Sequence, residues 1–201
     1  MSLVELIARA DRRGLAASGL ACLDRCLPLL EGDDEILRPL WATLAEDTGG
    51  VFGRGWADGL AQARAKLAGP GAAGEDEAVL LARRMLASAP DDCAGAGTRT
   101  WADACSVAAL RIHRLLDPAA DAAPEAGAAR ETGGFREADL ARADGGDGRS
   151  PLVAAELRRQ IAVLELLAGY GPAGLRPARE ASTEGRRVLR AVVSRRARGR
   201  C

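Results

Sequence analysis

Residues 150–169 read SPLVAAELRRQIAVLELLAG, and this stretch decides the fold class. Ser150 and Pro151 favour a helix start, because a serine side chain caps free N–H groups and proline suits the first helical position. Apolar residues then recur at helical spacing, at Val153, Leu157, Ile161, Leu164 and Ala168. Further apolar residues flank this stripe, so we expect a helix that is packed on two sides and stops at 169–172.

The same helical period recurs through residues 3–116. Ser2 and Glu5 fit a capping box, in which each side chain bonds the backbone of the other residue. Pro28 predicts the end or a bend of the second helix, and Pro39 predicts a kink in the next one. The clearest apolar stripe consists of Trp101, Ala104, Cys105, Ala108, Ile112 and Leu115.

Composition agrees with helices. The chain has 201 residues, of which 48% are hydrophobic and only 3% aromatic. Scarcity of aromatic and β-branched residues disfavours sheets, and no apolar stretch approaches the length of a membrane span. We therefore predict an all-α fold, either a multi-helix bundle or a solenoid-like stack, with a C-terminal helical hairpin.

Three regions differ in composition. Residues 1–116 are predicted to form a bundle of about six short helices. Residues 117–149 form an acidic segment rich in Ala, Gly and Pro, which we interpret as a mobile linker with a short helix at 135–143. Residues 150–201 are predicted to be a basic helical hairpin and tail that packs on the body or on a second copy.

Charge is unevenly distributed although the net charge is zero. Residues 149–201 carry 12 basic and 4 acidic residues, so they hold +8 and residues 1–148 hold −8. Such asymmetry indicates either a surface for nucleic acid or an acidic partner, or a basic end that docks on the acidic body of its own or a twin chain. The candidate binding residues for a protein partner or nucleic acid are Arg179, Arg186, Arg187, Arg190, Arg195 and Arg196.

Metal and phosphate motifs are weak. Cys22 and Cys26 share a helix face and, with Cys105 and His113, match the composition of a Cys₃His zinc site, but short-spaced cysteine knuckles are missing. We therefore predict no metal site and no cofactor, and interpret the five cysteines as reduced thiols of a cytoplasmic protein. The glycine-rich loop at 49–55 follows a predicted helix rather than a strand, so we interpret it as a joint.

Three functional hypotheses remain open. The leading one is a non-enzymatic cytoplasmic interaction or regulatory module that self-associates, with no catalytic residue. The first alternative is a nucleic-acid-associated protein that uses the Arg-rich C-terminal helix. The second is a small-molecule enzyme with a site inside the bundle, whose candidate residues are Asp33, Asp34 and His113; the two aspartates also suit helix caps.

Overall fold

The structure is a computed structural model that describes residues 1–46, 53–69, 76–92, 97–117 and 150–199. These residues form an all-α multi-helix bundle without strands. The expected short helix at 135–143 and nearly all of the expected linker lie outside the described residues. The helices are α1 (Leu3–Arg9), α2 (Arg12–Cys26), the 3₁₀ helix η1 (Leu27–Leu30), α3 (Arg38–Glu46), α4 (Gly53–Leu67), α5 (Glu77–Ala87), α6 (Gly97–Leu115), α8 (Pro151–Tyr170), the 3₁₀ helix η2 (Gly171–Gly174) and α9 (Leu175–Gly199).

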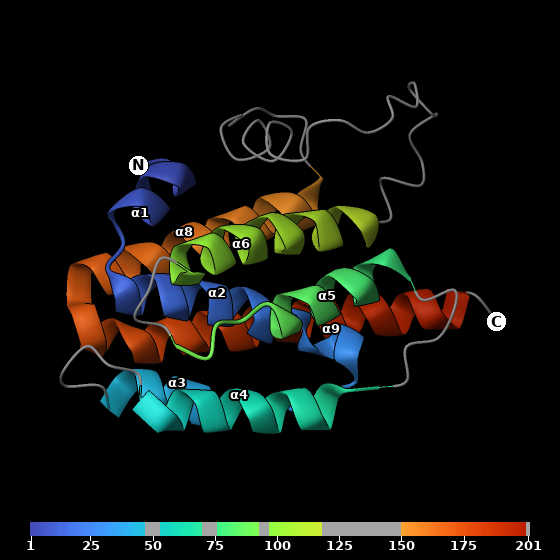
Figure 1. Cartoon of the computed structure of the whole chain (residues 1–201). Coiled ribbons are helices and arrows are strands. Elements are labelled where there is room, and N and C mark those ends of the chain that lie inside the picture. Colours follow the sequence, from blue (N-terminus) through green and yellow to red (C-terminus); the bar gives the residue numbers. More distant parts are fainter. Residues whose placement is uncertain (47–52, 70–75, 93–96, 118–149, 200–201) are drawn as a thin grey trace.

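Helix α2 lies at the centre, and α5, α6, α8 and α9 pack around it (Figure 1). Every residue from Gly14 to Cys26 is buried, so α2 has no solvent-facing side after its first two residues. Its many small residues let neighbouring helices approach closely. A Cβ on Gly19 would come within 2.6 Å of the Trp101 ring, which shows that the ring lies directly against the helix backbone.

Several helix ends lie where local chemistry predicts them. The N–H of Glu5 donates to Ser2 Oγ at 3.3 Å and the N–H of Ser2 donates to Glu5 Oε2 at 2.9 Å, which completes the capping box. Helix α2 ends at Cys26, and Pro28 lies in the first turn of η1. Pro39 does not kink a helix, because α3 begins at Arg38 and the first turn tolerates a residue without an N–H.

Helices α8 and α9 form an antiparallel hairpin that packs on α2 of the same chain (Figure 1). Gly171, with φ of +53°, ends α8 in a conformation that favours glycine. Val163, Leu164 and Leu189 of the hairpin are fully buried or nearly so. The hairpin therefore contributes to the core of the bundle.

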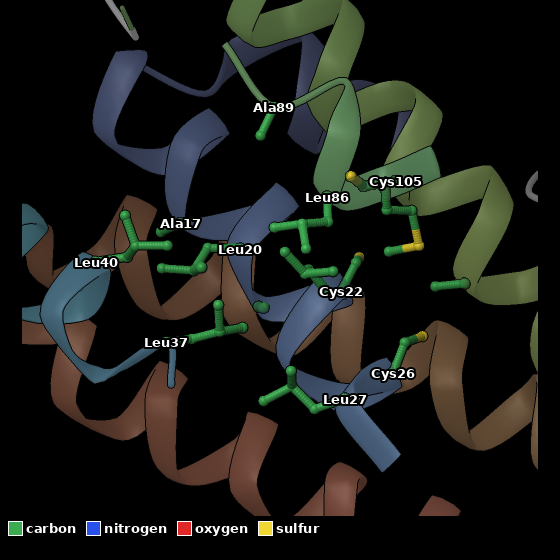
Figure 2. Close-up of a cluster of buried hydrophobic side chains, with 14 of the residues drawn as sticks. Ala17, Leu20, Cys22, Cys26, Leu27, Leu37, Leu40, Leu86, Ala89 and Cys105 are labelled. Carbon is green, nitrogen blue, oxygen red and sulfur yellow. The ribbon is translucent and has the colours of Figure 1, made fainter. Parts of the chain in front are cut away.

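The main hydrophobic core surrounds α2, where Leu20, Leu27, Leu37, Leu40 and Leu86 converge (Figure 2). Three cysteines, Cys22, Cys26 and Cys105, lie in the same core as thiols and not in disulfides. Burial raises the pKa of Cys26 and Cys105 well above the usual range, so these thiols stay protonated and behave as small apolar groups. None of the helices in the described ranges is long and apolar enough to cross a bilayer.

Candidate functional site

Two charged residues at the centre of the bundle, Asp24 and Arg25 of α2, connect the hairpin to the body. Arg25 donates from Nε to Glu156 Oε2 at 2.8 Å and from Nη2 to Glu156 Oε1 at 2.6 Å. Both side chains are fully buried. Burial alone would lower the pKa of Arg25, but the Glu156 carboxylate raises it, so the pair remains ionised.

Glu156 of α8 also contacts α6. Gln160 Nε2 donates to Glu156 Oε1 at 2.9 Å, and Ser106 Oγ donates to Gln160 Oε1 at 2.7 Å. His113 Nε2 lies 3.5 Å from Glu156 Oε2, and its Nδ1 is 2.7 Å from the carbonyl oxygen of Ala109. Burial alone would raise the pKa of Glu156, but Arg25 and His113 hold it below its usual value.

Asp24 forms the second link, to Arg186 of α9. Arg186 Nη1 donates to Asp24 Oδ1, and Trp41 Nε1 of α3 donates to the other oxygen, Oδ2, at 3.0 Å. Arg186 Nε also lies 3.1 Å from Asp34 Oδ1. Burial raises the pKa of Asp24, and the positive charge of Arg186 opposes that rise. Two adjacent residues of α2 thus hold the hairpin. Arg25 pairs with an acidic residue of α8, and Asp24 pairs with a basic residue of α9.

Close approach of α9 to this network requires a glycine. A Cβ on Gly185 would lie 2.4 Å from Arg25 Cδ and 3.0 Å from Arg159 Cδ. The aliphatic stem of Arg25 therefore passes directly under α9, and the stem of Arg159 lies beside the same glycine. Gly185 therefore contacts both Arg25 of the buried network and Arg159, which lines a depression on the surface of the hairpin.

The three residues of the enzyme alternative have separate partners. Asp33 is exposed and accepts the N–H of Glu35 at 2.8 Å, while Asp34 accepts Arg190 Nη2 at 2.8 Å. His113 lies in the buried network of Glu156. Across the described ranges, no group of three or more His, Cys, Asp or Glu side chains is arranged to hold a metal ion, and this includes the cysteines in Figure 2.

The six arginines predicted to bind a partner fall into different environments. Arg186 and Arg190 pair with acidic residues of the body, as the docking interpretation expects. Arg196 Nη1 donates to the carbonyl of Leu115 at 2.6 Å and so caps the last turn of α6. Arg187 is exposed beside Glu184, Arg179 is half-buried and Arg195 is exposed. Binding of a partner by these residues stays a prediction.

Two other arginines, Arg158 and Arg159 of α8, were not among those candidates. They line an open surface depression of about 310 Å³ together with Ala155 and Ala162. Arg158 is exposed and Arg159 half-buried, and neither has an ion pair within the described ranges. The apolar stretch around them drew attention to the core side of this helix and away from its outer side.

Sequence analysis also missed Arg25, Glu156 and Gln160. The available signal was the spacing of Glu156 and Gln160, which are four residues apart and interrupt an otherwise apolar face. No protein-family model, curated protein or solved structure matches the chain.

Proposed function

We propose that this protein is a non-enzymatic interaction module that associates with a second copy of itself through the outer surface of the α8–α9 hairpin. The proposal rests on the observation that the arginines of the hairpin fall into two groups, those that pair with the body and those on the outer surface. Arg186, Arg190 and Arg196 hold the hairpin on its own body, whereas Arg158 and Arg159 lie on its outer surface without an ion pair among the described residues.

The buried charges support a structural role rather than catalysis. Glu156 accepts from both Arg25 and Gln160, and Asp24 accepts from both Arg186 and Trp41. A general acid or base must reach a substrate proton within hydrogen-bond distance. These side chains are instead directed at each other inside the core, so their chemistry stabilises the arrangement of four helices.

Charge distribution supports self-association. The +8 of residues 149–201 matches the −8 of residues 1–148, so two copies attract each other when the basic part of one faces the acidic part of the other. Exposed acidic residues of the body include Glu31, Asp33, Glu46 and Asp58.

Light scattering of the full-length chain tests this proposal. At low salt and rising protein concentration, we expect the mass to rise toward twice 20.9 kDa. Raising the salt to about 0.5 M should shift the equilibrium back to monomer, because exposed charges are screened. A constant monomer mass up to millimolar concentration at low salt would overturn the proposal.

The same samples distinguish the nucleic-acid alternative, which Arg195 and Arg198 favour because both are exposed in the last turns of α9. Arginine binds phosphate with two parallel hydrogen bonds. Tight binding of a labelled single strand by a chain that remains monomeric, with affinity that falls steeply with salt, would replace self-association by that alternative.

A further inference from the structure

The depression on α8 is lined by two arginine and two alanine side chains. Ala155, Arg158, Arg159 and Ala162 follow one another at helical spacing, so they form one face two turns long. The depression measures about 310 Å³, room for roughly ten water molecules.

Acidic side chains that could complement this face gather in one described turn of the body. Glu31, Asp33 and Glu35 are all exposed within five residues, between η1 and α3. Of these, Glu35 pairs only with exposed Arg38 at 2.7 Å, a contact of the kind that contributes little to stability. Among the other described residues, exposed acids are more dispersed or, like Asp91, which pairs with Arg64, already have a partner.

The basic face and the acidic turn lie beside α9. Arg159 lies next to Gly185, and Asp34 of the acidic turn is 2.8 Å from Arg190 Nη2. These two positions of α9, Gly185 and Arg190, are about 140° apart around the helix, so the α8 face and the acidic turn lie on different sides of α9. A two-fold axis parallel to α9, which brings two α9 helices together in parallel, would place the α8 face of each copy near the acidic turn of the other. A two-fold axis repeats every contact, so the interface closes at a dimer.

The region near such an axis is also self-complementary. Glu184 and Arg187 are exposed and one turn apart on α9, with Arg187 Nη1 3.7 Å from Glu184 Oε2. In a parallel pair of helices related by this axis, the glutamate of one copy can face the arginine of the other. Like charges therefore need not meet at the centre of the dimer.

We infer that Arg158 and Arg159 of one copy bind the acidic turn of residues 31–35 of a second copy, and that this contact occurs twice in a two-fold dimer. The inference rests on the proposed self-association and identifies its surfaces. Exposed arginine and carboxylate groups form bidentate pairs, and several pairs at one interface act together.

A charge exchange between two variants tests the contact. The first variant carries R158E and R159E, and the second carries E31R and E35R. Each variant alone brings like charges together at both contacts, so light scattering should show at least a tenfold weaker dimer. An equimolar mixture places opposite charges together again at both contacts, so it should regain a heterodimer.

The matched control carries R54E and R84E, which changes the same number of exposed charges on α4 and α5. It should dimerise within about twofold of the unmodified chain, because its substitutions lie outside the contact. Circular dichroism and the urea midpoint check that each variant is folded. R158E alone repeats the test with an exposed residue if the half-buried Arg159 proves sensitive.

Each outcome has a definite meaning. Loss of the dimer in both variants, with recovery in the mixture and an unchanged control, supports the contact. If the unmodified chain dimerises but the variants do so equally well, or the mixture stays monomeric, the contact is wrong and self-association stands. If the unmodified chain is monomeric, the proposed function and the contact both fail.

Discussion

The inner and outer sides of the α8–α9 hairpin use the same residue type in opposite ways. On the inner side, Arg186 pairs with Asp24, and Arg25 pairs with Glu156. All four side chains are almost completely buried. On the outer side, Arg158 and Arg159 border an open depression without an ion pair in the described part of the chain. A count of basic residues does not separate these roles; burial and the presence of a carboxylate partner do.

The largest effect should follow from removal of an inner carboxylate. Glu156→Ala leaves Arg25 charged and unpaired in the core, and we expect a loss of about 3–5 kcal/mol in the free energy of unfolding. Urea unfolding followed by circular dichroism measures this loss. The double variant Arg25→Met with Glu156→Leu should recover most of it, because neither charge of this pair remains in the core. A single variant as stable as the parent would show that the pair does not hold the hairpin.

A smaller loss of stability is expected from a substitution at Gly185, which contacts both Arg25 and Arg159. In Gly185→Ala the new methyl group collides with the stem of Arg25 at 2.4 Å, and overpacking of this kind costs about 1–3 kcal/mol. Gly169→Ala in α8 is the control, because a Cβ there meets nothing within 4 Å. Thermal unfolding should show a lower midpoint for the first variant and an unchanged or higher one for the second.

The dependence of stability on acidic pH tests whether the buried Arg25–Glu156 pair is ionised. The pKa of Glu156 in the folded chain lies below its usual value of 4.5, so the unfolded chain binds the proton first. The contribution of Glu156 to stability is therefore present above pH 4.5 and is lost as the pH falls through its folded pKa. The difference in unfolding free energy between the parent and Glu156→Gln should shrink over that range. A constant difference would contradict the ionised pair.

The smallest effect on stability is expected on the outer side. The R158E variant should unfold within about 0.5 kcal/mol of the parent, because Arg158 is exposed and substitutions of exposed residues without partners rarely change stability further. Urea unfolding measures its stability, and light scattering measures its self-association. An unchanged urea midpoint with weaker self-association would show that the outer side acts in association and the inner side in folding. A large loss of stability would show that Arg158 also belongs to the docking contacts.

Local chemistry made much of the fold predictable from the sequence. Ser2 with Glu5, Ser150 with Pro151, and Pro28 each act through a few neighbouring residues, and their helix ends lie close to the predicted positions. The all-α architecture follows from periodicity that runs through the whole chain.

Roles that depend on distant partners were not predictable. Arg25 and Glu156 are 131 positions apart, so nothing near either residue shows that both are buried. Arg186 looks like its exposed neighbour Arg187 in the sequence, and only the placement of α9 beside Asp24 distinguishes them. Arg158 and Arg159 were overlooked because their outer location depends on which sides of α8 the other helices cover.

A double-mutant cycle of Arg25 and Glu156 tests the central claim most directly, namely that paired charges inside the bundle fix the hairpin to the body. Unfolding free energies of the parent, Arg25→Met, Glu156→Leu and the double variant give the coupling between the two side chains. We expect a coupling of about 2–3 kcal/mol, at the upper end for residues in one network. A coupling below about 0.5 kcal/mol, as found for independent sites, would contradict the account.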